Sequence, residues 1–305
     1  MATQSPPQIF DTARHARFRS RAVQRWAEYD FLKARVSSQM AERLADTAHN
    51  FKAGLDLGCH TGELARALLE TGKVAEIQGA EVSPAMAVAA KARGLDVTVW
   101  DGETLPFEER QFDLVASALL LHWVNDLPGS LIQVNRALKP DGLFLGAYFG
   151  AGTLAELRES LMQAETELMD GAAPRVSPLP GLPDSAALLQ RAGFALPVAD
   201  VETITVRYDT MFHLIEDLRG MGEQAAFATG GRPLSRRVLA RAAEIYASQF
   251  ADDDGRIRAS FVITWLSGWA PAPNQPKPKR PGSARASLAE AVGSIEKSAG
   301  EKAGE

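Results

Sequence analysis

The sequence has a single cysteine, Cys59, among its 305 residues. One cysteine forms neither an internal disulfide nor a multi-cysteine metal site, so it points to a reducing compartment. Apolar runs are short as well, and none approaches the roughly 20 residues that a membrane-spanning helix needs. The opening residues MATQSPPQIF lack the basic start and apolar core of a secretory signal. We therefore expect a soluble intracellular enzyme.

A surplus of positive charge is also missing. The chain carries 33 basic and 38 acidic residues, which gives a net charge of −5. Non-specific nucleic-acid binders are usually basic as a whole, so this balance argues against a nucleic-acid partner. The five histidines show no spacing typical of an iron-binding triad, and we expect no metal site.

Strand-like and helix-like segments alternate from Phe51 to Gly150. The apolar, strand-like runs are KAGLDLG, VAEIQGAEV, LDVTVW, FDLVASALL and GLFLGAYFG. Between them lie helical segments such as SPAMAVAAKARG, which opens with a serine cap and a proline at the first helical position. This alternation is typical of a parallel sheet covered on both faces. The predicted fold class is therefore α/β, doubly wound.

The segments around this core define the predicted domain organisation. Residues 1–50 form a helical N-terminal segment ahead of a domain over residues 51–270. Its last two strands, ALPVADVETITVRY and RIRASFVITWLSGW, are separated by helices, which predicts a helical insertion at about residues 208–252. Residues 271–305 are rich in Pro, Ala, Ser, Gly, Lys and Glu and lack aromatic residues, which favours a disordered tail.

The segment GLDLGCHTGELARALL carries the most informative motif. A strand ends near Asp56, a loop holds Gly58 and Gly62, and a helix begins near Glu63. Glycine lets the backbone approach a ligand closely, and a helix N-terminus offers unpaired N–H groups. The spacing matches neither the G-x-G-x-x-G dinucleotide fingerprint nor a Walker loop. We expect Asp56, Gly58 and Gly62 to bind a cofactor at the carboxyl ends of the strands.

Acidic residues occupy the same position in the next two strands. Glu81 ends the second strand, where a carboxylate accepts both hydroxyls of a ribose. Asp101 and Gly102 follow the third strand, where the acid can receive the exocyclic amine of adenine. Any one such acid is more often solvated or a helix cap. The ordered set of Asp56, Glu81 and Asp101 predicts a site for an adenosyl cofactor.

These motifs resemble those of the class I S-adenosylmethionine-dependent methyltransferases. The matching segments are DLGCHTG, AEVSPAM, WDGETLPFEERQFDLVAS and LKPDG. The resemblance implies a Rossmann-like, mainly parallel seven-stranded sheet and S-adenosyl-L-methionine as the cofactor. The family usually has glycine where this chain has His60. We expect the His60 side chain to point outward, so that the loop still admits the cofactor.

The resemblance narrows at LLLHWVNDLP, residues 119–128. This segment is similar to the branch that holds the biotin-pathway malonyl-carrier-protein methyltransferase and respiratory complex I assembly factor 5. The segments YDFLKARV, SPLPGLPDSAALLQRAGF, RGMGEQAAF and ITWLSGW resemble assembly factor 5 more closely. That family implies action on a protein subunit of NADH:ubiquinone oxidoreductase (complex I), where it is associated with hydroxylation of an arginine.

Two residues of the 119–128 segment are the catalytic candidates. His122 and Trp123 follow the fourth strand, where class I enzymes place the loop that faces the acceptor. They could orient an acceptor or stack on a guanidinium, although each could equally be a packing residue. The RGMGEQ run is too glycine-rich for a helix interior and predicts a helix break, either as a lid over the pocket or as a simple turn.

Three functions stay open on the sequence. The first is an enzyme of the assembly factor 5 type that acts on a complex I subunit. The second is an O-methyltransferase that acts on a carrier-bound or small-molecule carboxylate. The third is a non-catalytic assembly chaperone with bound cofactor. We expect a cytoplasmic location, with peripheral association at the inner membrane through the client left open.

Overall fold

The computed structural model describes residues 8–169, 171–229, 233–275 and 293–294. The chain divides into two units, Met1–Pro271 and Ala272–Glu305, and the fold below is that of the first. Most of the tail predicted to be disordered, residues 276–292 and 295–305, lies outside the described residues.

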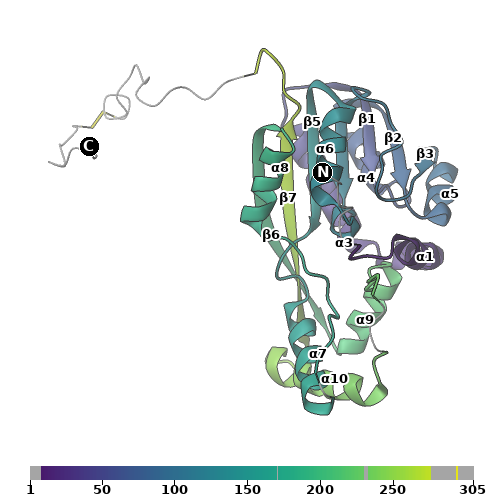
Figure 1. Cartoon of the computed structure of the whole chain (residues 1–305), viewed down its shortest axis with the longest axis vertical. Coiled ribbons are helices and arrows are strands. Elements are labelled where there is room, and N and C mark those ends of the chain that lie inside the picture. Colours follow the sequence, from purple (N-terminus) through teal and green to yellow (C-terminus); the bar gives the residue numbers. More distant parts are fainter. Residues whose placement is uncertain (1–7, 170, 230–232, 276–292, 295–305) are drawn as a thin grey trace, which may run out of the picture. The chain divides into compact units, whose positions relative to one another are not determined.

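A seven-stranded sheet forms the centre of the first unit (Figure 1). Its strands are β1 (Phe51–Leu57), β2 (Val74–Glu81), β3 (Asp96–Val99), β4 (Phe112–Ala118), β5 (Leu138–Phe149), β6 (Ala195–Tyr208) and β7 (Ile257–Trp269). The strand order is β3-β2-β1-β4-β5-β7-β6. Strands β1 to β5 pair in parallel, and β7 runs antiparallel to both β5 and β6. The predicted mainly parallel, Rossmann-like sheet is confirmed.

Helices cover both faces of this sheet. They are α1 (Thr12–Ala22), α2 (Trp26–Tyr29), α3 (Phe31–Ala45), α4 (Glu63–Glu70), α5 (Pro84–Ala92), α6 (Leu127–Ala137), α7 (Ala155–Leu168), α8 (Leu182–Arg191), α9 (Met211–Gly220) and α10 (Arg236–Phe250), with short 3₁₀ turns η1 (Val23–Arg25) and η2 (Leu121–Trp123). One core joins α3, α4, α7, α9 and α10 to the sheet, and the other joins α6 and α8 to its opposite face. The two cores explain why the strands read as continuous apolar runs.

Local sequence signals fix where several helices begin and end. Ser83 caps α5 by accepting from the Met86 N–H, and Pro84 is its first residue. Asp126 caps α6 by accepting from the Gly129 N–H. Helix α6 ends at Ala137, and the LKPDG run that follows it belongs to β5.

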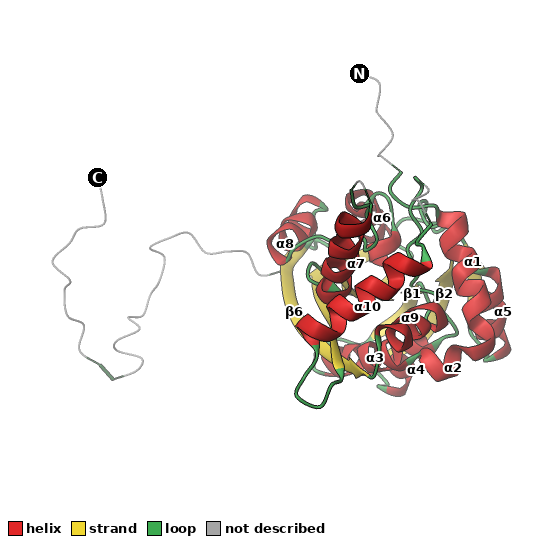
Figure 2. Cartoon of the chain, turned by 90° about the horizontal axis from the view of Figure 1, so that it is seen from below, coloured by secondary structure: helices red, strands yellow, loops and turns green. Residues whose placement is uncertain are grey.

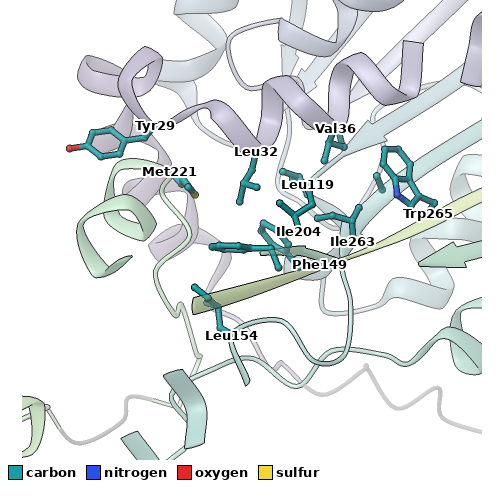
Figure 3. Close-up of a cluster of buried hydrophobic side chains, with 14 of the residues drawn as sticks. Tyr29, Leu32, Val36, Leu119, Phe149, Leu154, Ile204, Met221, Ile263 and Trp265 are labelled. Carbon is teal, nitrogen blue, oxygen red and sulfur yellow. The ribbon is translucent and has the colours of Figure 1, made fainter. Parts of the chain in front are cut away.

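Helices α9 and α10 lie between β6 and β7, within the segment predicted as a helical insertion. Seen from below in Figure 2, α7, α9 and α10 lie in front of the strands. Figure 3 shows part of this core, in which Met221 after α9, Leu32 of α3 and Phe149 at the end of β5 belong to one cluster of buried side chains. Among the described residues, none of the helices has the length and apolar character needed to span a bilayer.

Candidate functional site

The candidate site lies where the parallel strands β1, β2 and β4 end, an edge that we call the carboxyl edge. Asp56 precedes the last residue of β1, and Glu81 is the last residue of β2. Both side chains are completely buried. The strands pair in register, with Leu57 opposite Ala80, so the two acids come to the same edge of the sheet, as the sequence predicted.

The loop after β1 is a tight glycine bend. Gly58 and Gly62 have φ angles of +81° and +96°, in the left-handed region that favours glycine. A Cβ on Gly58 would lie 2.6 Å from the Leu120 Cβ. Gly62 then forms the N-terminal cap position of α4. Both predicted glycines are therefore required by the backbone of this bend.

A buried lysine that the sequence analysis missed holds the bend in place. Lys33 of α3 donates from Nζ to the Gly58 carbonyl at 3.0 Å and to the Ala118 carbonyl at 2.8 Å. Burial lowers the pKa of Lys33, and the nearby Asp56 opposes this shift. The sequence does contain one indication of this role, because Lys33 stands among the apolar residues of YDFLKARV. A lysine on the buried face of a helix is unusual unless it has polar partners.

Asp56 accepts a hydrogen bond at Oδ2 from the Ala65 N–H of α4, at 3.0 Å. Its other oxygen, Oδ1, is buried and has no hydrogen-bond partner among the described residues. Burial raises the pKa of Asp56 to about 6, and the Lys33 ammonium opposes the rise. An uncompensated carboxylate oxygen at this edge is a polar atom that a ligand could satisfy.

Both carboxylate oxygens of Glu81 accept hydrogen bonds from the protein itself. Its Oε2 accepts from Arg19 Nη2 at 3.0 Å and from the His60 backbone N–H at 2.9 Å. Its Oε1 accepts from the Ser83 N–H at 2.9 Å. Arg19 comes from α1, and neither side chain of this ion pair is exposed. Helix α1 therefore covers the carboxylate that the sequence assigned to a ribose.

The expectation that His60 points outward is wrong. His60 is 1% exposed, its ring stacks on Trp26 with centroids 4.9 Å apart, and its Nδ1 lies 2.9 Å from the Gly58 carbonyl oxygen. Burial, and then the charge of Arg19, lower its pKa well below the usual value, so the ring is neutral. The physical reason is Trp26, which covers the bend and offers the imidazole an aromatic partner. The buried His60 imidazole therefore leaves less space in the loop that the sequence predicts to bind the cofactor.

The two residues predicted beyond β3 differ in their burial. Asp101 is exposed, and its Oδ1 accepts from the N–H groups of Glu103 and Thr104. Gly102 is buried at a φ of +89°, and a Cβ there would lie 3.6 Å from the Thr12 Cγ2 of α1. Asp101 thus shapes its own turn, while Gly102 lets the start of α1 approach.

The two catalytic candidates lie together on η2, directly after β4. His122 and Trp123 are both buried. His122 Nε2 and Trp123 Nε1 lie 2.9 Å and 2.7 Å from the same oxygen, Oε2 of Glu223. Glu223 follows α9 and was not among the predicted site residues. Only the RGMGEQ break pointed toward it.

A cavity of about 800 Å³ opens beside these two rings. Its walls come from η2, the end of β5, α7, α9 and the loops next to them, and are mostly apolar. Residues that line it include His122, Trp123, Phe149, Leu157, Phe212 and Glu223. The volume is in the range of small-molecule and side-chain sites in enzymes.

Helix α1 connects the carboxyl edge to this cavity. Arg19 reaches Glu81, while His15, one turn earlier, stacks on Trp123 with centroids 4.6 Å apart. Burial lowers the pKa of His15 well below its usual value. The start of the helix is tied to the 119–128 segment, because Asn125 Oδ1 accepts from the N–H groups of Ile9 and Phe10 at 2.8 Å. In the part of the chain that the structure describes, no group of three or more His, Cys, Asp or Glu side chains is arranged to hold a metal ion.

Comparison with known proteins places this geometry in context. Residues 55–146 match the family model described as a methyltransferase domain. The chain is 42% identical over 265 residues to the mitochondrial arginine hydroxylase NDUFAF5 of Mus musculus, covering 86% of this chain and 77% of the relative. The Homo sapiens protein of the same name is also 42% identical, over 86% of this chain and 76% of its own length.

Two further comparisons are more distant. A malonyl-[acyl-carrier protein] O-methyltransferase of Halorhodospira halophila is 32% identical over 81% of this chain and 84% of the relative. Among solved structures, the YcgJ protein of Bacillus subtilis superposes with a TM-score of 0.55 at 16% identity, covering 78% of this chain and 99% of that one. At that identity, the structural likeness supports the fold alone.

The buried ion pair predicts a large effect on stability. Arg19→Met removes one partner and leaves the Glu81 carboxylate uncompensated in the interior, so we expect the free energy of unfolding to fall by roughly 3–5 kcal/mol in urea titration. Arg25→Met is the matched control, because both side chains of the Arg25–Glu28 pair are 58% exposed. Removal of this exposed pair should leave the free energy of unfolding nearly unchanged. Equal effects of the two substitutions would show that the Arg19 pair is not buried.

The raised pKa of Asp56 predicts a pH-dependent stability difference. Between about pH 4 and pH 6 the folded protein keeps the Asp56 proton that the unfolded chain has lost, so the free energy of unfolding falls as pH rises and then levels off. Asp56→Asn lacks this effect. Relative to the variant, the wild-type protein should lose roughly 3 kcal/mol between pH 4 and pH 7, at about 1.4 kcal/mol per pKa unit. Urea titrations of both proteins across this range measure the difference, and a constant difference would contradict the assignment.

Proposed function

The chain belongs to the family of the arginine hydroxylases NDUFAF5, and from this premise we propose that it hydroxylates an arginine side chain of a protein. The observation that carries the proposal is 42% identity over 86% of the chain, against 32% for the carrier-protein methyltransferase. The protein is an enzyme built on a methyltransferase fold. Because such a fold does not by itself fix the reaction, the hydroxylase relatives decide the proposed chemistry.

The carboxyl edge supplies donors and acceptors that suit S-adenosyl-L-methionine. Glu81 would hold the ribose hydroxyls, the Gly58–Gly62 bend would lie against the amino-acid part, and the unpaired Asp56 Oδ1 offers a further acceptor there. Asp101 and Gly102 would border the adenine. When bound, the cofactor would supply a methyl group activated on a sulfonium, whereas insertion of the hydroxyl oxygen also requires an oxygen source and an electron donor from outside the chain. The residues fit this group, provided that Arg19 releases Glu81 and the His60 ring turns out of the bend.

Arg19 and the cofactor therefore compete for one carboxylate. Arg19 and the His60 N–H both donate to Oε2 of Glu81, and the Ser83 N–H donates to Oε1. The backbone donors belong to the bend itself, whereas Arg19 belongs to α1. Movement of α1 is thus the change that exposes the carboxylate to a ribose.

The cavity beside η2 is the proposed place of the acceptor side chain. Trp123 offers an aromatic ring at its wall, a group on which a planar guanidinium stacks favourably. The mostly apolar wall excludes water from the side-chain stem. We propose that the client is a protein subunit of NADH:ubiquinone oxidoreductase and that any contact with the inner membrane occurs through this client.

Deletion of the gene tests the proposal directly. Mass spectrometry of complex I subunits from the deletion strain should show loss of one oxygen atom from an arginine that is hydroxylated in the parent, and the wild-type gene should restore it. Biotin auxotrophy with unchanged arginines would instead assign carrier-protein methylation. Defective complex I assembly without any altered residue would assign a chaperone role.

Substitutions of the two partners of the ion pair, Glu81 and Arg19, should change the cofactor affinity in opposite directions. Wild-type protein should bind S-adenosyl-L-methionine in the micromolar range, on the order of −8 kcal/mol by calorimetry. Glu81→Ala should weaken binding by about 1–3 kcal/mol, because a hydrogen-bond acceptor for the ribose is lost. Arg19→Met should tighten it by about tenfold, since the competing cation is gone.

The control for this comparison is again Arg25→Met, whose ion pair lies on the exposed surface. It should bind the cofactor as the wild-type protein does. Weaker binding by Arg19→Met would show that Arg19 assists the cofactor instead of competing with it.

A further inference from the structure

A single turn after α9 brings a carboxylate against both catalytic candidates. Glu223 Oε2 is 2.9 Å from His122 Nε2 and 2.7 Å from Trp123 Nε1. The side chains of His122 and Glu223 are 4% and 8% exposed, so the contact is shielded from water. A charge-assisted hydrogen bond gains strength in such surroundings.

Two glycines, at the end of α9 and in the turn that follows, let this segment pack closely against α2 and α1. A Cβ on Gly220 would lie 2.2 Å from the Tyr29 ring, and Gly222 has a φ of +76° with its Cβ position 3.1 Å from the Arg19 Cα. Met221 between them is 4% exposed and packs into the core beside Leu32 (Figure 3). The Glu223 N–H then donates to the Leu218 carbonyl at 2.9 Å. The RGMGEQ run thus ends α9 and directs Glu223 inward.

The chemistry of the three groups fixes where the histidine proton lies. The indole Nε1 of Trp123 is always a donor, and an ionised carboxylate only accepts. His122 Nε2 must therefore carry a hydrogen, and in the neutral ring Nδ1 is then an acceptor. That Nδ1 is buried without a hydrogen-bond partner in the described part of the chain. The other ionisable groups at this site are His15, which stacks on the Trp123 ring, and the cavity-lining residues Arg14, Arg175, Glu216 and Arg219.

We propose that Glu223 is a positioning residue, which holds His122 in its Nε2–H tautomer and fixes the Trp123 ring at the wall of the acceptor cavity. Its effect on turnover rests on the proposed function, while its effect on the two rings does not. Another carboxylate of α9 cannot substitute, because Glu216 is 57% exposed and bonds instead to the Tyr29 hydroxyl and Arg25. Loss of Glu223 leaves the two buried donors without this acceptor, so the hydrogen bonds no longer fix the orientation of either ring.

Nitrogen-detected NMR of histidine-labelled protein at pH 8 tests the contact without any substrate. Wild-type His122, assigned by the loss of its signals in His122→Gln, should show a protonated Nε2 and an unprotonated Nδ1. Glu223→Ala should lose this preference and shift the Trp123 indole N–H resonance. Glu223→Gln should restore both, since the amide oxygen also accepts. Glu216→Gln is the control and should leave both signals unchanged.

Turnover on the client subunit tests the consequence. Glu223→Ala should lower kcat by about 10²-fold with little change in KM, because orientation is lost and not binding. Glu223→Gln should recover most of the rate. Unchanged signals in Glu223→Ala would overturn the contact, and changed signals with unchanged kcat would overturn the positioning role. If the wild-type protein itself modifies no arginine, the hydroxylase assignment fails, while the tautomer result still decides the contact.

Discussion

The buried ion pair between Arg19 and Glu81 is the interaction on which the arrangement of the site depends. It ties α1 across the carboxyl edge, and both side chains are fully removed from water. Its geometry is incomplete, however, because Arg19 Nε and Nη1 are buried without partners in the described chain. A guanidinium that forms one bond out of several recovers only part of its desolvation free energy. The ion pair therefore holds α1 in place, but the hydrogen bonding of Arg19 is incomplete, so a polar ligand of Glu81 can replace Arg19.

The same helix makes the two halves of the site dependent on each other. His15 lies one turn before Arg19 and stacks on Trp123, so a movement that frees Glu81 also uncovers one face of the indole. Glu223 belongs to the turn after α9 and not to α1. That turn nevertheless contacts α1, because a Cβ on Gly222 would lie 3.1 Å from the Arg19 Cα and Arg14 donates to the Phe227 carbonyl at 2.8 Å. A movement of α1 is therefore also felt by the segment that carries Glu223.

Much of the fold could be predicted because its signals are local. Apolar strand runs, the Ser83 cap and the Gly58–Gly62 bend follow from residues near in sequence, and parallel pairing brings Asp56 and Glu81 to one edge. The partners of those acids could not be predicted in the same way. Arg19, Lys33 and Glu223 reach the site from α1, α3 and the turn after α9, respectively, and their contacts join residues 25 to 101 positions apart. The prediction for the orientation of the His60 side chain was wrong for the same reason, since that orientation depends on Trp26, which comes from another segment.

These long-range contacts also join the methyltransferase-domain match to segments that lie outside it. The methyltransferase-domain match covers residues 55–146, which hold the glycine bend, Glu81, His122 and Trp123. Arg19, Lys33 and Glu223 all lie outside that range, as do most walls of the acceptor cavity. The groups that cover the carboxyl edge therefore come from segments outside the methyltransferase-domain match, although the relatives align over 81–86% of the chain. Because a methyltransferase fold does not by itself fix the reaction, we propose that these covering segments and the cavity walls select the acceptor.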